Sequence, residues 1–154
     1  MKPSRDAVQI RSMRPADVSA ALEVLGAWNM APTPERANAE RSGIIVENAF
    51  VAEHDGRVIG TAGWFAISDT MAETASLAVD PDYQGLGIGY RLQEARLASM
   101  RERGFCTVRT ETDRPATIKW YVEKFGYRII GTNPKKHTFS LADVNEWTVL
   151  EMAL

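Results

Sequence analysis

The sequence predicts a mixed α/β fold in which a hairpin comes first and helices later connect the strands. Three features predict this class: an Asp55-Gly56 dipeptide between two apolar stretches, a glycine-rich segment directly after a predicted strand, and helical periodicity on both sides of a later strand. Asp-Gly is a strong signal for a two-residue hairpin turn. Hairpins in the first half and helix crossovers in the second half are typical of such a mixed fold.

Seven segments show the alternation or the short apolar runs that are typical of strands. The Asp55-Gly56 turn joins the second and third of them, and a longer loop joins the last two. The predicted strands are residues 8–13, 49–54, 57–67, 73–79, 105–112, 127–132 and 146–154.

Four helices are expected between these strands. The first opens near Pro15, which suits a first helical turn, and a short second helix is expected within the polar segment 30–41. The third follows the glycine-rich segment and should end at Gly104, and the fourth should end at Gly126. Apolar residues at helical spacing predict the buried faces of the first and fourth helices; they are Val18, Ala21, Leu22, Leu25 and Trp28, and Ile118, Tyr121, Val122 and Phe125.

Length and composition indicate one soluble domain, residues 1–154. The hydrophobic share is 45%, the charged share is 25% and the formal net charge is -2, so no strong field attracts nucleic acid or an anionic membrane. No apolar run approaches the roughly 18 residues of a membrane span, and the start does not resemble a signal peptide. We therefore expect a cytoplasmic protein without nucleic-acid or membrane partners. Its single cysteine, Cys106, lies in an apolar run and is expected to be buried.

The segment from Leu77 to Leu92 reads as a strand, a turn, three alternating glycines and a helix. Glycines at this position allow positive φ angles and let bare N–H groups approach a ligand. The first turn of the following helix has unpaired N–H groups and a partial positive charge, so it can bind a pyrophosphate. Tyr90 stands where a dinucleotide-binding G-x-G-x-x-G would need its third glycine, and no Gly-Lys-Ser/Thr follows. The alternative is a glycine-rich turn without a ligand.

Gln84, Gly87 and Gly89 after a strand match the pattern Gln/Arg-x-x-Gly-x-Gly/Ala, and the segment resembles the acetyl-coenzyme-A signature of the GNAT superfamily of N-acetyltransferases. The segment 120–131, WYVEKFGYRIIG, is similar to the fourth helix and sixth strand of that family. The resemblance implies a GNAT fold, in which a mixed sheet of about seven strands is splayed between its fourth and fifth strands and flanked by four helices. Acetyl-CoA would lie in the gap between those two strands.

The resemblance also implies how acetyl-CoA is held. Backbone N–H groups from Gln84 to Tyr90 would hold the pyrophosphate, and the edge of strand 77–79 would pair with the pantetheine arm. A backbone N–H near Val79 would polarise the thioester carbonyl. The implied binding residues are Leu77, Ala78, Val79, Gln84, Gly85, Leu86, Gly87, Ile88, Gly89 and Tyr90.

The implied reaction is direct attack of a primary amine on the thioester in a ternary complex. An alkyl amine with a pKa of about 10.4 is mostly protonated at neutral pH, so a base must take a proton. Glu73 is the candidate base, because it is similar in position to the catalytic glutamate of histone-acetylating members; the alternative is a solvated strand carboxylate. Tyr121 is the candidate acid, although the family pattern places its tyrosine at the position of Val122. Tyr121 would serve if the helix carries a bulge, and otherwise it is a core tyrosine.

By the same resemblance, residues 28–40 and the loop 133–145 would wall the acceptor site. Trp28, Lys136 and His137 are the candidate substrate-binding residues. Cations at 135–137 could meet a carboxylate or phosphate on the acceptor, or they could belong to a solvated loop. No cluster has metal-ligand spacing, so no metal is expected.

The expected function is therefore an acetyl-CoA-dependent N-acetyltransferase. Its acceptor would be a small-molecule amine, or a protein terminus or lysine. The alternative is an acyl-CoA-binding sensor without catalysis. The last strand, 146–154, is long and apolar, and we expect that it could pair as an edge across a homodimer.

Overall fold

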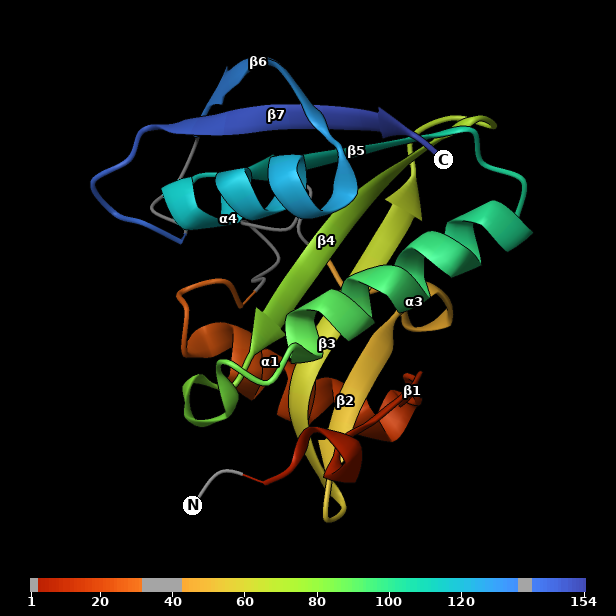
Figure 1. Cartoon of the computed structure of the whole chain (residues 1–154), viewed down its shortest axis with the longest axis vertical. Helices are drawn as coiled ribbons and strands as arrows, with labels where there is room; N and C mark the ends of the chain where they lie inside the picture. The colour runs from red at the N-terminus through yellow and green to blue at the C-terminus, as the bar shows by residue number, and fades with distance from the viewer. Residues whose placement is uncertain (1–2, 32–42, 136–139) are drawn as a thin grey trace.

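The computed structural model describes residues 3–31, 43–135 and 140–154, and it forms a seven-stranded mixed sheet with helices on both faces (Figure 1). The strand order is β1-β2-β3-β4-β5-β7-β6, in which β4 and β5 are parallel and the other neighbours are antiparallel. All seven predicted strands are present: β1 Gln9–Ser12, β2 Phe50–His54, β3 Arg57–Ala66, β4 Met71–Val79, β5 Thr107–Thr112, β6 Arg128–Pro134 and β7 Glu146–Ala153.

The helices within the described residues are α1 Val18–Gly26, α3 Ile88–Glu102 and α4 Pro115–Trp120, which continues as a π-helix over Tyr121–Phe125. Short 3-10 turns occur at Arg5–Ala7, Pro15–Asp17, Val46–Asn48 and Pro81–Tyr83. Pro15 therefore opens a 3-10 turn that leads into α1, and Gly104 and Gly126 follow α3 and the π-helix with φ angles of 85° and 81°. The short helix expected within 30–41 lies almost entirely outside the described residues. No helix of the described ranges is long and apolar enough to cross a membrane.

Alternation along the strands places α1 and α3 on opposite faces of the sheet. Val51 of β2 packs in a cluster with Ala21 of α1, whereas its neighbour Ala52 packs in a cluster with Leu92 of α3. The predicted hairpin is confirmed: Asp55 and Gly56 have φ angles of 50° and 76°, as a type I′ turn requires.

The sheet is splayed between β4 and β5, as the resemblance implied. Paired residues run only from Met71↔Thr107 to Glu73↔Arg109, although both strands continue. Beyond the last pair, the Thr74 hydroxyl donates a hydrogen bond to the Thr110 hydroxyl, and the strands then diverge (Figure 1). β4 also changes its register against β3 in the region of Ser76, whose φ is 60°. The bulge and the splay together leave the C-terminal half of β4 unpaired on its β5 side.

Three sequence predictions about exposure and position were wrong. Cys106 is exposed, because Phe105 and Val108 supply the apolar contacts at this end of β5. Val122 is 37% exposed, because the π-helix rotates it away from the core. The segment 146–154 is not a sheet edge, because β7 lies between β5 and β6; the edge on this side is β6.

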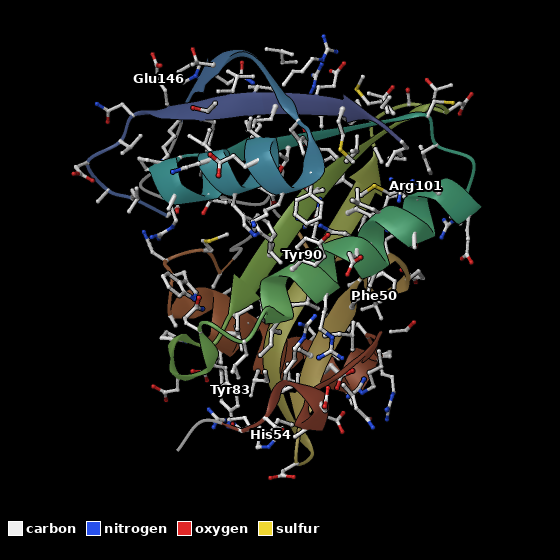
Figure 2. The ribbon with its side chains drawn as sticks, viewed as in Figure 1. Phe50, His54, Tyr83, Tyr90, Arg101 and Glu146 are labelled. Carbon is white, nitrogen blue, oxygen red and sulfur yellow. The ribbon has the colours of Figure 1, made fainter. Side chains whose placement is uncertain are left out.

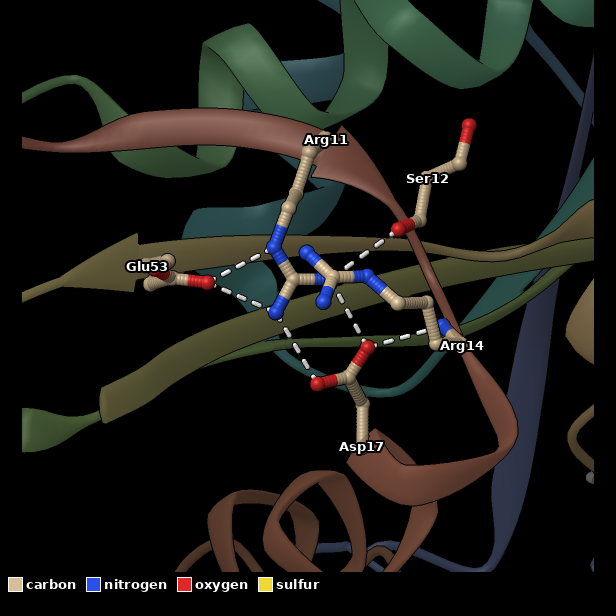
Figure 3. A network of polar contacts seen from close by, with 5 residues as sticks. All are labelled: Arg11, Ser12, Arg14, Asp17 and Glu53. Carbon is tan, nitrogen blue, oxygen red and sulfur yellow. Dashed lines mark hydrogen bonds and ion pairs between the residues drawn. The ribbon is translucent and has the colours of Figure 1, made fainter. Parts of the chain in front are cut away.

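A polar network ties the first strand to the segment that follows it (Figure 3). Arg11 of β1 donates to both carboxylate oxygens of Asp17 at 2.8 and 2.9 Å and to Glu53 of β2 at 2.6 Å. The Arg14 backbone N–H also donates to Asp17, at 2.7 Å. Hydrogen bonds from Arg11 are the largest cause that lowers the pKa of Asp17 to about 2, and the same pairing raises the pKa of Arg11. The network fixes the entrance to α1 against the first two strands.

Candidate active site

A cavity of about 450 Å³ occupies the gap between β4 and β5. It brings together nearly all of the predicted site residues: Trp28, Glu73, Leu77, Ala78, Val79, Gln84, Gly85, Gly87, Ile88, Gly89, Tyr90 and Tyr121. Leu86 does not line the cavity, because its side chain packs against the cluster that contains Ile88 and Leu92. Lys136 and His137 lie outside the described residues.

The glycine-rich segment forms one end of the cavity. Gly85 and Gly87 have φ angles of 82° and 72°, and Gly87 is the N-cap of the 15-residue helix α3 without any side-chain cap. The first N–H groups of α3 therefore keep the anion-binding character that helix N-termini have. Tyr83, just before this segment, has its hydroxyl 3.2 Å from Nδ1 of His54, which anchors the turn to β2 (Figure 2).

Two arginines flank this helix N-terminus. A Cβ added to Gly87 would lie 3.9 Å from Cζ of Arg5, so the Arg5 guanidinium lies next to the bare glycine backbone. Arg91 donates a hydrogen bond to the Arg5 carbonyl at 3.2 Å. Sequence reasoning missed Arg5, because no local pattern links the N-terminal 3-10 turn to a segment so much later in the chain. Positive charges near a helix N-terminus favour an anion there.

Tyr90 lies in the first turn of α3 (Figure 2). Its ring stacks on Phe125 with ring centroids 4.9 Å apart. This contact connects the start of α3 with the end of the π-helix. A dinucleotide-binding G-x-G-x-x-G segment would have its third glycine at this position. Here the position holds the Tyr90 ring, which lines the cavity.

The π-helix directs Tyr121 into the cavity. A π-helix accommodates one more residue in a turn than an α-helix does, and such bulges occur frequently at functional sites. Tyr121 starts the π-helix, five residues before Gly126, and is only 3% exposed. The bulge that Tyr121 needed in order to reach the site is therefore present.

A buried arginine holds the Tyr121 hydroxyl. Arg96 of α3 is fully buried, and its Nη2 donates to Tyr121 Oη at 2.7 Å. Its Nη1 donates to the carbonyls of Gly63 and Ala75, at 3.2 and 3.3 Å. Since arginine has no acceptor, Tyr121 must accept this bond, and its own hydrogen stays available for another partner. Arg96 also lines the cavity.

Gln93 extends this network away from the cavity. It accepts a hydrogen bond from Nε of Arg96 and donates to Tyr127 Oη at 2.9 Å. Burial raises the pKa of Tyr127, which therefore stays neutral. Sequence reasoning missed Gln93 and Arg96, because a polar side chain on a helix is ordinarily read as exposed.

Glu73 approaches the gap from the other face. Its neighbour Ala72 packs beneath α3 with Leu97 and Met100, so alternation points Glu73 toward the α1 face. Glu73 is 4% exposed and its register partner on β5 is Arg109. The alternative of a solvated strand carboxylate does not agree with this burial. Tyr121 and Glu73 thus enter one cavity from opposite sides of the sheet.

Trp28 and Arg114 bridge the open end of the gap. The Trp28 indole donates to the Val79 carbonyl at 2.9 Å, at the end of β4. Arg114, between β5 and α4, lies with Cζ 5.1 Å from the centroid of the Trp28 ring. Both side chains line the cavity on its α1 side.

One of the predicted acceptor-binding cations has an internal partner. The side chain of Lys135 is buried, pairs with Asp113 and donates to the Leu141 carbonyl at 2.8 Å. Its ammonium also lies 4.5 Å from the centroid of the Trp147 ring. Among the residues that the structure describes, no group of three or more His, Cys, Asp or Glu could hold a metal.

The model of the acetyltransferase (GNAT) family matches residues 13–127, and the chain belongs to this family. It is 34% identical over 125 residues to a mycothiol acetyltransferase from Thermomonospora curvata, a match that covers 72% of this chain and 41% of that protein. The chain spans less than half the length of the first curated relatives that it matches.

Solved structures share the fold. Ard1 from Thermoplasma volcanium superposes with a TM-score of 0.79 at 24% identity, covering 96% of this chain and 98% of the other. N-acetylglutamate synthase from Neisseria gonorrhoeae, complexed with coenzyme A and N-acetyl-glutamate, superposes with a TM-score of 0.71 at 20% identity, covering 96% of this chain and 35% of the other.

Proposed function

We propose that residues 1–154 form one N-acetyltransferase domain that transfers the acetyl group of acetyl-CoA to a primary amine. The observation that carries this proposal is the cavity between β4 and β5, which joins an uncapped helix N-terminus to Tyr121 and Glu73. Family membership and the coenzyme A bound to the Neisseria gonorrhoeae relative support the choice of cosubstrate.

The chain's residues fit acetyl-CoA at two places. N–H groups from Gln84 to Tyr90 would hold the pyrophosphate, with Arg5 beside them. The C-terminal half of β4, residues 77–79, has no strand partner on its β5 side and would pair with the pantetheine arm. When bound, acetyl-CoA supplies an acetyl group activated as a thioester.

Glu73 would act as the base and Tyr121 as the acid. The acceptor amine enters from the α1 side and gives its proton to Glu73, directly or through water. Tyr121 holds its hydroxyl hydrogen toward the cavity, because Arg96 can only donate to its oxygen. That hydrogen is then in place for the departing thiolate. Arg96 is a positioning residue in this scheme.

The alternative of a sensor without catalysis rests on two departures from the family pattern, the displaced tyrosine and the missing asparagine at the start of the fourth helix. The π-helix brings Tyr121 into the cavity, which favours catalysis. Small-molecule amines and protein amines both remain acceptor classes of this proposal.

The test is calorimetric titration with acetyl-CoA, followed by thiol-release assays over amino acids, polyamines, aminoglycosides and short peptides. We expect binding and turnover with one amine class, and loss of turnover with retained binding in Glu73→Gln. Gly87→Trp should abolish binding by filling the pyrophosphate site. Gly104→Trp is its matched control, because Gly104 also has a positive φ, of 85°, and does not line the cavity.

Binding without turnover on any amine would favour the sensor. Absence of binding in the parent protein would overturn the assignment of the glycine-rich segment.

A further inference from the structure

Arg114 is a half-buried cation in the wall of the cavity, and within residues 3–31, 43–135 and 140–154 no carboxylate pairs with it. We propose that Arg114 binds a carboxylate on the amine acceptor, so that the acceptor is an amino carboxylate. This inference rests on the proposed N-acetyltransferase function and names the substrate class of that site.

The guanidinium of Arg114 is held in a defined position. Its Nε donates to Ser140 Oγ at 3.1 Å, its Nη2 donates to the Trp28 carbonyl at 3.4 Å, and its Cζ lies over the Trp28 ring, 5.1 Å from the centroid. A guanidinium has five N–H donors, so these two bonds leave three donors for a ligand. An arginine fixed in this way loses little further freedom when it binds a planar carboxylate.

Arg5 lies beside Gly87 at the glycine-rich end of the cavity, and the other described cations nearer the acceptor side have partners in the protein. Lys135 is paired with Asp113, and Arg109 donates to Glu151 at 3.2 Å. Arg96 lies on the α3 side and is satisfied by carbonyls, an amide and Tyr121. Arg114 therefore differs from them by facing the acceptor side without an acidic partner among the described residues. A cation that is partly removed from water without a counter-ion is costly, and an anionic ligand would offset that cost.

Carboxylates on the same cavity wall would receive the amine end of the acceptor. Glu73 and Glu111 both line the cavity, and Glu111 also accepts a bond from Asn133 at 2.7 Å. An ammonium would be attracted toward these carboxylates while a carboxylate would be attracted toward Arg114. The cavity thus has the charge distribution of an amino-carboxylate site.

The chain also limits the distance between the two ends. Arg109 is the register partner of Glu73, and Arg114 lies five residues further along the chain. Five residues span at most roughly 18 Å. This span limits the separation between Glu73, which would receive the amine, and Arg114, which would bind the carboxylate. Amino carboxylates of several lengths are therefore reasonable probes.

The test compares matched acceptors: glycine, 4-aminobutyrate and 6-aminohexanoate, each against its amide, and 2-aminoethylphosphonate as a second oxyanion. For the wild-type protein we expect at least one acid to have kcat/KM about tenfold or more above its amide. Arg114→Met should raise KM for that acid by about tenfold to a hundredfold, with little change for the amide and in the Kd for acetyl-CoA. Arg114→Lys should restore part of the difference in kcat/KM between the acid and its amide. Lys119→Met, on the exposed face of α4, should change neither the KM for the acid nor the Kd for acetyl-CoA.

Equal kcat/KM for each acid and its amide would overturn the inference and leave the proposed function standing. A preference for the phosphonate over every carboxylate would overturn the carboxylate assignment. Turnover of no amine at all would instead mean that the proposed function fails. The comparison of acids with amides needs only the wild-type protein, so it can overturn the inference even if Arg114→Met does not fold, and Arg114→Lys then tests the role of this residue.

Discussion

The Tyr121 hydroxyl accepts a hydrogen bond from a fully buried arginine at 2.7 Å. Because Arg96 makes its other bonds to Gln93 and to the carbonyls of Gly63 and Ala75, it is fixed in place by the sheet and by its own helix. The phenol is consequently held in one orientation, with its hydrogen directed elsewhere. In the proposed mechanism, this orientation is the contribution of Arg96.

A double-mutant cycle tests this relation between the two residues. We expect Tyr121→Phe to lower kcat about a hundredfold, in the range for the loss of a general acid, and Arg96→Met to lower it about tenfold. If Arg96 acts through Tyr121, the double variant should be no slower than Tyr121→Phe alone. The measurements are kcat and the Kd for acetyl-CoA.

A purely structural Arg96 would instead lower kcat further in the Tyr121→Phe background and weaken acetyl-CoA binding. Arg96→Lys should recover part of the rate, because a cationic donor is kept. Arg101→Met, at the exposed end of the same helix (Figure 2), serves as the control and should behave as wild type.

At the scale of elements, the end of α4 shows how one inserted residue changes a site. The π-helix over Tyr121–Phe125 leaves Val122 exposed and Tyr121 buried. In the family pattern that this chain resembles, the tyrosine lies four residues before the helix-ending glycine. The π-helix therefore compensates for the spacing of five residues between Tyr121 and Gly126.

Deletion of Val122 should convert the π-helix into a continuous α-helix. Tyr121 would then precede the glycine by four residues and would still face Arg96, so kcat should stay within a few-fold of wild type. A regular helix should also raise the midpoint of thermal unfolding. Steady-state kinetics and a thermal melt check both expectations.

Deletion of Lys119, before Tyr121, is the matched control, since it keeps the five-residue spacing and disturbs the α-helical part. If the variant that lacks Val122 has a kcat as low as that of Tyr121→Phe, the proposal that the π-helix compensates for the five-residue spacing is contradicted.

At the scale of the whole molecule, one ion-pair network secures the N-terminal strand and the entrance to α1 against the rest of the sheet (Figure 3). The pKa of Asp17 is lowered from its ordinary value of 3.8 to about 2, chiefly by hydrogen bonds from Arg11. The folded state thus binds fewer protons at this site than the unfolded state does. Its stabilising effect is complete above pH 3.8 and is lost as the pH falls toward 2.

Asp17→Asn should therefore lower the urea midpoint of unfolding at pH 7. The difference from wild type should shrink as the pH falls from about 4 to about 2, because the wild-type carboxylate is then protonated. Urea titrations of both proteins across this range measure the difference. Asp69→Asn, an exposed loop substitution, serves as the control and should show no such trend. A difference between the urea midpoints of wild type and Asp17→Asn that stays constant with pH would contradict the role assigned to the Asp17 carboxylate.

Local patterns were sufficient to predict the order of the strands and of the helices that the structure describes. Asp55-Gly56 predicted a hairpin because positive φ angles at two successive residues need such residues, and both angles are positive in the structure. Gly104 and Gly126 predicted helix ends for the same reason. Exposure was harder to predict, as Cys106 and Val122 show, because it depends on which neighbours the chain brings next to each side chain.

The sequence by itself determined the order of the strands and of the described helices, the glycine-rich segment Gly85–Gly89 before α3 and the family resemblance, because each depends on residues close together in the chain. Only the tertiary structure decided which side chains complete the site. Arg5, Arg96 and Arg114 come from a 3-10 turn, a helix and a strand-to-helix connection. Arg96 and Arg114 line the cavity that forms where β4 and β5 diverge after three residue pairs, and Arg5 lies beside Gly87 at its end. The contacts that orient these arginines join segments far apart in sequence.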